Sequence, residues 1–395
     1  MGALDGIRVL DLGVLVQAPQ AALLLGDMGA SVIKVELPGI GDQSRWIPAT
    51  YGHAMSGYWI GCNRGKRSVT IDLRKPEGRD VFLRLADSAD VVVSNFKPGT
   101  LDDWGLSYEV LSARNPRVIY ATGATFGAIG PNAHREGADL AGQAAGGLIS
   151  TTGVDGGPVT PVGATIADHM SSQHLASGIL AALFARFTTG RGQRVEVSLV
   201  GGAIWAQASE FSAYLASGKI PGRSNGGHPL INGTYGIVPT ADGHVAVVGV
   251  VALARPAFAR LIGNEAFFDD PRFAPPLMTE AQKIALLKEL EPIFVTKTTN
   301  EWVHELRGIG VRCAPVRDYA AIVADPEVYE NGYLVKVNDP EHGEITVVGS
   351  PLRMSDTPMV PSTRAPELGE HTEEILLEIG LEWEEIAALR DLGAI

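Results

Sequence analysis

The sequence predicts an α/β protein in which a mostly parallel, doubly wound sheet forms a large domain and a smaller α+β domain interrupts it. Two observations support this fold class. In the first half of the chain, short apolar runs alternate with helical stretches of about ten to fifteen residues. Near 218–236 Gly, Pro, Asn and Ser cluster, and a hairpin pattern follows.

The strands of the first half are expected where β-branched and apolar residues run together. Helical stretches are expected at about 17–28 and up to residue 85, and a long helix at about 170–188 before the stop signal at 190–192. Strands that are apolar throughout belong to parallel sheets covered on both faces, and such sheets bind ligands beyond the carboxyl ends of their strands. The expected strands are 7–12, 31–36, 68–73, 90–96 and 117–122.

The second half predicts a separate domain and then a return to the first. Strand-like segments at 234–240 and 244–251 flank Ala241-Asp242-Gly243, which is a hairpin signal. Helices are expected at 279–293 and 299–309, strands at 334–338 and 344–349, and helices at 371–379 and 382–391. We therefore divide the chain into a large domain (1–224), a small domain (225–325) and a return segment completing the large one (326–395).

Composition excludes several classes of function. A formal charge of −13 argues against a general nucleic-acid binder, because phosphate contacts need a basic surface. No apolar run is long enough to span a membrane, and the first residues lack the pattern of a signal peptide. The two cysteines cannot form a disulfide framework. We expect a soluble cytoplasmic protein with no nucleic-acid or membrane partner.

Common catalytic and metal-binding signatures are missing from the sequence. There is no G-x-S-x-G, no H-E-x-x-H and no phosphate-binding G-x-x-x-x-G-K-[ST]. His169 and His174 lie five positions apart on an expected helix, so they point to different faces. No metal site is therefore expected.

Asp139 stands out because it opens a segment rich in Gly and Ala, where a ligand or a second backbone can approach closely. One interpretation is a structural cap of the helix that begins there. The other is a reactive carboxylate kept ionised by the helix N-terminus. The residues alone leave both interpretations open.

The order of several motifs resembles class III CoA-transferases, the family of formyl-CoA, carnitine and bile-acid CoA-transferases (CaiB/BaiF type). Asp139 opens the pattern D-x-x-x-Q-A-x-x-G, and the similarity extends over nearly the whole chain. The segments that carry it are 4–11, 29–36, 63–73, 95–99, 139–147, 189–193, 351–353 and 368–372.

The resemblance implies a Rossmann-like large domain, an interlocked homodimer and an enzyme that moves CoA from an acyl-CoA donor to a carboxylic acid acceptor. CoA is a substrate, and no tightly bound cofactor is implied. By the same resemblance, Asp139 is the nucleophile that forms an aspartyl anhydride and then an aspartyl–CoA thioester. The residues implied in CoA binding are Val16, Gln17, Ala18, Ile71, Arg74, Asn95 and Phe96.

Two departures from the family pattern affect the details. Pro38 and Asp103 stand where some formyl-CoA transferases carry arginines, which leaves the phosphate contacts open. The alternative is an α-methylacyl-CoA racemase, which needs a His immediately before the position of Asp139, together with the aspartate at 168. Ala138 occupies the first position, so one of two bases is missing and the transferase is favoured. Backbone amides at 146–147 or 226–227 are the candidates for an oxyanion site.

Overall fold

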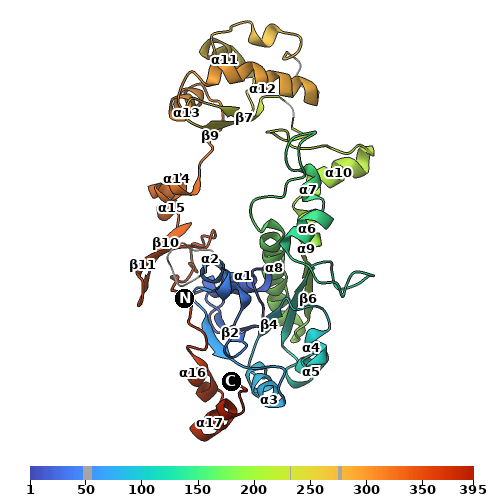
Figure 1. Cartoon of the computed structure of the whole chain (residues 1–395), viewed down its shortest axis with the longest axis vertical. Helices are drawn as coiled ribbons and strands as arrows, with labels where there is room; N and C mark the ends of the chain where they lie inside the picture. Colours follow the sequence, from blue (N-terminus) through green and yellow to red (C-terminus); the bar gives the residue numbers. More distant parts are fainter. Residues whose placement is uncertain (48–55, 232, 275–277) are drawn as a thin grey trace. The chain divides into compact units, whose positions relative to one another are not determined.

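The large unit of the protein is built on a six-stranded parallel sheet. A computed structural model describes residues 1–47, 56–231, 233–274 and 278–395. The strand order is β3-β2-β1-β4-β5-β6. The chain adds β2 and β3 on one side of β1 and the later strands on the other, so the order switches sides between β1 and β4. Figure 1 labels β2, β4 and β6 of this sheet. The strands are β1 (Arg8–Asp11), β2 (Ser31–Glu36), β3 (Arg67–Thr70), β4 (Val91–Ser94), β5 (Ile119–Ala124) and β6 (Arg194–Ser198). The expected doubly wound sheet is confirmed.

Alternating side chains of the strands face two separate cores. Val9 packs against α1 (Gln17–Asp27) and α8 (Ile166–Thr189), whereas its neighbour Leu10 packs against α3 (Pro76–Ala86) and α5 (Tyr108–Arg114). Both side chains are fully buried, as expected for a parallel sheet covered by helices on each face. Figure 1 shows α1 and α8 lying together beside the sheet.

Strand β6 was not predicted from the sequence. Its five residues, 194–198, alternate charged or polar side chains with valines and form one edge of the sheet next to β5. Val195 and Val197 pack against the core that includes α1 and α8, whereas Arg194 and Glu196 are exposed, so the alternation follows the two faces of the sheet. The apolar-run criterion that found the central strands therefore did not find this one.

The end of the chain returns to the large unit. Helices α16 (Thr372–Glu378) and α17 (Trp383–Asp391) add Ile375, Leu376 and Ile386 to the same core as Leu10. Strands β10 (Leu334–Asp339) and β11 (Gly343–Val348) form a separate antiparallel pair. Residues more than 300 positions apart are thus joined, for example Thr70 and Thr372 through their hydroxyl groups at 3.2 Å.

The small unit has its own sheet and core. Strands β7 (Tyr235–Pro239), β8 (His244–Val248) and β9 (Cys313–Pro315) pair antiparallel beside α11 (Arg255–Leu261), α12 (Glu280–Phe294) and α13 (Thr299–Gly308). Its core includes the stacked rings of Phe294 and Trp302, whose centroids lie 4.2 Å apart. Both α12 and α13 begin with a capping box, which explains why the sequence located them well.

Contacts group the chain into two compact units: 1–146, 163–206 and 326–395 form the large one, and 147–162 and 207–325 the small one. The division into domains at 224 and 325 remains a prediction.

Within the described ranges, no helix combines the length and apolar character needed to cross a bilayer. The remaining helices are α2 (Gly57–Asn63), α4 (Thr100–Asp103), α6 (Asp139–Ala145), α7 (Leu148–Thr151), α9 (Leu199–Trp205), α10 (Ala208–Ser217), α14 (Tyr319–Val323) and α15 (Pro326–Glu330).

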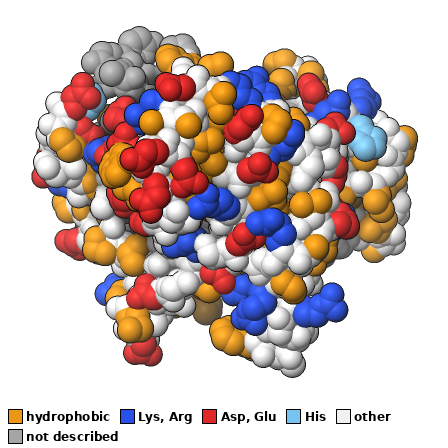
Figure 2. All heavy atoms as spheres, turned by 90° about the horizontal axis from the view of Figure 1, so that it is seen from below, with side chains coloured by type: hydrophobic (Ala, Val, Ile, Leu, Met, Phe, Trp, Pro, Cys, Tyr) orange, Lys and Arg blue, Asp and Glu red, His pale blue; other side chains and the backbone are white. Residues whose placement is uncertain are grey.

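The surface carries both signs of charge. On the face drawn in Figure 2, acidic and basic side chains are interspersed with apolar ones and form no extended surface of one sign. On this face, such a pattern gives no broad electrostatic attraction toward a polyanion.

Candidate functional site

The carboxyl ends of the parallel strands open into a cavity of about 310 Å³. It lies where the strand order reverses, which is the place where doubly wound sheets bind ligands. Three of the predicted CoA-binding residues line it, Ile71 and Arg74 after β3 and Phe96 after β4. Trp104 completes this wall, with its ring edge-on to Phe96 at 5.5 Å between centroids.

Arg74 lines this cavity, and an ion pair with Asp72 fixes one side of its guanidinium. Its side chain is 60% exposed, and its guanidinium donates through Nε and Nη2 to the Asp72 carboxylate, both at 2.8 Å. This hydrogen bonding lowers the pKa of Asp72. A guanidinium fixed at one side keeps its remaining N–H groups for an anion in solution.

Val16, Gln17 and Ala18 open α1, and all three side chains are buried. Gln17 donates to Ser171 Oγ at 3.0 Å and presses against Gly123, where a Cβ would lie 2.3 Å from its amide oxygen. These side chains therefore face the protein. Any contact with a ligand at this turn must come from backbone N–H groups, which the first turn of a helix leaves without intrahelical acceptors.

The side chain of Asn95 likewise forms hydrogen bonds with the backbone of the turn after β1. Its side chain accepts from Val14 N at 2.7 Å and donates to Val14 O at 2.9 Å, which ties the end of β4 to the turn after β1. The structure thus brings the seven predicted CoA-binding residues to one edge of the sheet, with four of them acting on or through the turn at 13–18.

Asp139 begins α6, and its carboxylate caps a different helix. Oδ1 accepts from Ala167 N at 2.8 Å and from Asp168 N at 3.3 Å, both in the first turn of α8. Oδ2 accepts from Gln143 Nε2 at 2.7 Å. The N-cap residue of α8, Thr165, gives no side-chain cap, so Asp139 fills that role from outside the helix.

Glycine residues at 142 and 146 allow α6 to pack closely against α8 and α9. A Cβ on Gly142 would lie 2.6 Å from Leu199 Cβ and 3.0 Å from Ala167 Cβ, and one on Gly146 would lie 2.4 Å from Ala203 Cβ. The Gly/Ala-rich composition of this segment thus serves helix packing between α6, α8 and α9, and it sets the position of Asp139.

The structure adds Asp168 to the site as the immediate neighbour of Asp139. Burial, together with the charge of Asp139, raises the pKa of Asp168 from 3.8 to about 7. No hydrogen bond or ion pair holds its carboxyl group within the described part of the chain. The sequence had assigned this aspartate no contact with Asp139, because the two lie 29 positions apart.

Two other side chains, His169 as a base and Cys62 as a nucleophile, are less suited to catalysis than Asp139 and Asp168. His169 contacts Thr165 Oγ1 at 3.1 Å and Gln20 Oε1 at 2.5 Å, and burial lowers its pKa. Cys62 is buried, which raises the pKa of its thiol to about 12, so it carries almost no thiolate at neutral pH.

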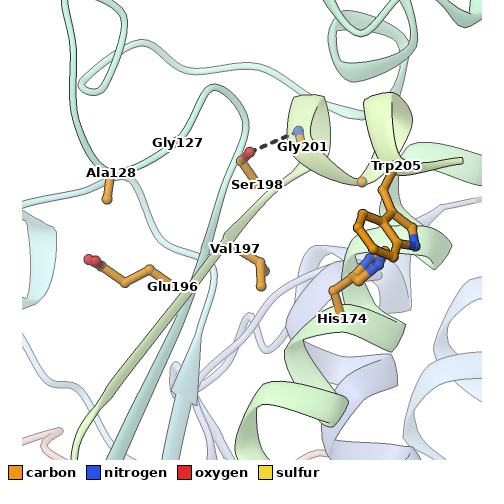
Figure 3. A pocket seen from close by; sticks show the side chains of 9 residues that line it. Gly127, Ala128, His174, Glu196, Val197, Ser198, Gly201 and Trp205 are labelled. Atoms are coloured by element: carbon orange, nitrogen blue, oxygen red, sulfur yellow. Dashed lines mark hydrogen bonds between the residues drawn. The ribbon is translucent and has the colours of Figure 1, made fainter. Parts of the chain in front are cut away.

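A second cavity, of about 400 Å³, lies beside β6 and α9 (Figure 3). His174 and Trp205 form one wall, with their rings edge-to-face at 5.6 Å, and Glu196 stands on the opposite side. Ser198 is the N-cap residue of α9, and its Oγ accepts from Gly201 N at 3.0 Å. The residues predicted from the sequence to bind CoA or attack its thioester do not line this cavity.

Comparison with known proteins gives one consistent result. The model of the family described as CoA-transferase family III matches residues 4–372. A succinyl-CoA:mesaconate CoA-transferase from Haloarcula hispanica is 36% identical, over 96% of this chain and 97% of that protein. A succinate–glutarate CoA-transferase from Agrobacterium fabrum is 35% identical over 95% of each. A crystal structure of a CaiB/BaiF family protein from Brucella suis superposes with a TM-score of 0.85, at 34% identity, covering 96% of this chain and 99% of that one.

Proposed function

Because this chain belongs to CoA-transferase family III and is a CoA-transferase, we propose that it exchanges CoA between an acyl-CoA and a free carboxylic acid through covalent aspartyl intermediates. The observation that carries this proposal is the pair of neighbouring carboxyl groups, Asp139 and Asp168, at the junction of α6 and α8.

The proposed exchange needs a carboxylate on the enzyme. The carboxylate attacks the thioester carbonyl and expels CoA thiolate, leaving a mixed anhydride between the enzyme and the donor acid. The thiolate then attacks the enzyme's own carbonyl in the anhydride, which frees the donor acid and leaves an enzyme–CoA thioester. The acceptor acid then repeats these two steps in reverse. In every step the leaving group is either a thiolate or a carboxylate, so no step has to expel a much poorer leaving group than the others.

The sequence-based assignment of the nucleophile to Asp139 remains a prediction, and the geometry favours its neighbour. A carboxylate offers about four lone-pair positions, and three donors already occupy those of Asp139. The carboxyl group of Asp168 is not restrained in this way within the described residues. Its raised pKa also makes the ionised form a stronger nucleophile, while about half of it is ionised at neutral pH.

In this proposal Asp139 is a positioning residue for Asp168. By accepting from the N–H groups of Ala167 and Asp168, it fixes the first turn of α8. Its negative charge keeps the neighbouring carboxyl group basic. This is one environment with two carboxyl groups in different roles, as often occurs in active sites.

CoA is proposed to enter along the carboxyl edge of the sheet. The cavity lined by Ile71, Arg74 and Phe96 suits the nucleotide portion, with Arg74 directed at a phosphate. The backbone of 16–18 would then guide the pantetheine arm. Since Pro38 and Asp103 supply no cation, Arg74 carries more of the phosphate recognition here than the family pattern implies.

We propose a short dicarboxylic acid as the acceptor. The two relatives described above are named for succinyl-CoA with mesaconate and for succinate with glutarate, so both exchange CoA between dicarboxylates. A panel of glutarate, mesaconate, acetate and oxalate, assayed against succinyl-CoA by chromatography of the CoA thioesters, tests this choice. Transfer to acetate at the rate of transfer to glutarate would contradict it.

We also propose that the enzyme is the interlocked homodimer that the resemblance implies. Large apolar side chains on α8 are exposed in the single chain, Phe184 at 78% and Phe187 at 88%. Burial of such side chains against a second copy would remove them from water.

The covalent intermediate can be trapped and located. The enzyme is incubated with succinyl-CoA and then hydroxylamine, which converts an activated aspartyl group to a hydroxamate. Asp139 and Asp168 fall in one tryptic peptide, since Arg135 and Arg186 are the nearest cleavage sites, so fragment-ion mass spectrometry must separate them. Asp155 in the same peptide is exposed and serves as an internal control.

The outcomes distinguish the candidates. Label on Asp168 that disappears in an Asp168→Asn enzyme supports the proposed nucleophile. Label on Asp139 would establish the sequence-based assignment instead. Turnover without label at either position would rule out a covalent aspartyl route.

A further inference from the structure

The turn between β1 and α1 is held by side chains rather than by a backbone ladder. Asp11 Oδ1 accepts from Gly13 N at 2.8 Å, Asp42 Oδ1 accepts from Leu15 N at 3.0 Å, and Lys34 Nζ donates to Gly13 O. Asn95 binds both polar groups of Val14. Five successive backbone groups are therefore restrained from four different segments of the chain.

The turn needs this restraint because its backbone is strained. Leu15 has φ of +63°, one of only two positive values at non-glycine positions in the described residues. A left-handed conformation is unfavourable for an ordinary L-residue, because it brings the Cβ too close to the following carbonyl oxygen. Such a conformation persists where the surroundings hold it, and it is found most often at ligand sites.

The restraining groups form a fully buried ion network. Lys34 Nζ lies 2.8 Å from Asp42 Oδ2 and 3.6 Å from Asp11 Oδ2, and Lys66 Nζ lies 2.7 Å from the same Asp11 oxygen. The side chains of these four residues are at most 1% exposed. A buried ion pair stabilises a fold little better than apolar side chains of the same size would. A contribution to stability alone therefore does not explain why two lysines and two aspartates are buried beside this turn.

The turn leads directly into the proposed CoA site. Leu12, Gly13 and Val14 line the cavity of about 310 Å³ together with Lys34 and Asp42. The next residues, 16–18, present only their backbone to a ligand. We infer that the buried network of Asp11, Lys34, Asp42 and Lys66 is a positioning device that holds the turn at 13–15 in the one conformation that binds CoA. The inference rests on the proposed function, because it concerns the same CoA site.

Two alanine variants separate positioning from plain stability. Asp42→Ala removes the acceptor for Leu15 N and the partner of Lys34. Asp27→Ala removes a buried ion pair from the same unit, with Arg64 at 2.5 Å, that has no hydrogen bond to the turn among the described residues. Isothermal titration of free CoA into the full-length proteins gives the Kd without requiring turnover.

We expect Asp42→Ala to raise the Kd for CoA about tenfold or more, since the apparent Kd rises in proportion to the loss of the binding-competent population. Asp27→Ala should change the Kd by less than about threefold. In turnover assays Asp42→Ala should raise the KM for acyl-CoA while kcat at saturation stays within about threefold, as the nucleophile is untouched.

Each other outcome has a defined meaning. Equal Kd values for Asp42→Ala and wild type, or equal weakening by both variants, overturn the inference. If the wild-type enzyme itself binds no CoA, the proposed site fails, and that failure is seen without any variant. Should Asp42→Ala not fold, Asp42→Glu decides: it keeps the charge beside Lys34 but displaces the acceptor of Leu15 N, so a wild-type Kd in that variant overturns the inference.

Discussion

Replacing Asp168 by asparagine should make the enzyme more stable as well as inactive. The reasoning starts from the pKa of Asp168, which burial and the charge of Asp139 raise from 3.8 to about 7. The folded protein therefore holds this proton more tightly than the unfolded chain does. As pH rises between these two values, the unfolded chain loses this proton while the folded protein keeps it, so the free energy of unfolding falls.

The size of the effect follows from the same two values. Each pKa unit corresponds to about 1.36 kcal/mol, so the full cost above neutral pH is about 4 kcal/mol. Part of the side chain is accessible to water, which reduces the cost to about 2–4 kcal/mol. Asparagine has nearly the same shape and no charge, so Asp168→Asn should recover this amount above about pH 7 and almost none near about pH 4.

The assay is denaturant-induced unfolding at several pH values, followed by fluorescence. Asp103→Asn is a suitable control because Asp103 is an exposed aspartate of the same unit. The difference in unfolding free energy between wild type and Asp168→Asn should grow as pH increases, while that of the control stays flat. A destabilised Asp168→Asn, or a difference that does not depend on pH, would refute the claim that Asp168 is held in an unfavourable, reactive environment.

Three further outcomes are expected from the geometry of the site and of α8. Asp139→Ala should lower the unfolding free energy by about 1–2 kcal/mol because the first turn of α8 loses its cap; the same assay is run near about pH 5, where Asp168 is protonated and is not repelled by Asp139, and an unchanged value there would contradict the capping role. Gly142→Val should cost about 1–3 kcal/mol, since even its Cβ would meet Leu199 at 2.6 Å. Phe187→Glu should halve the molar mass found by light scattering if α8 contacts a second copy; a wild-type mass would exclude that surface.

Much of the fold was predictable because its signals are local. The central strands are apolar throughout, and the helices of the small unit begin with capping boxes at Thr279 and Thr298. Strand β6 was missed because it depends on pairing with β5 and not on its own composition. The division into contact units, with 147–162 in the small one, likewise depends on which segments pack together.

The sequence predicted candidate residues for the site but not the interactions among them. Motif order placed Asp139 and the proposed CoA-binding residues along the chain. It gave no indication that Asp139 caps a helix beginning 27 residues later, because that contact is made by folding. The basic residues at 64, 66 and 67 show the same limit, because the sequence does not indicate their partners. Arg64 and Lys66 pair with buried aspartates, and Arg67 pairs with Glu374 and Glu378.

The same geometry bears on the choice between acyl transfer and proton exchange. Removing and returning a proton beside a thioester requires two bases on opposite sides of one carbon. Asp168 can serve as one, but Ala138 is the N-cap of α6 and offers no titratable group. The neighbouring imidazole, His169, is engaged by Thr165 and Gln20. A single basic carboxyl group beside a capping carboxylate is therefore suited to one nucleophilic attack, which is what CoA transfer requires and racemisation does not.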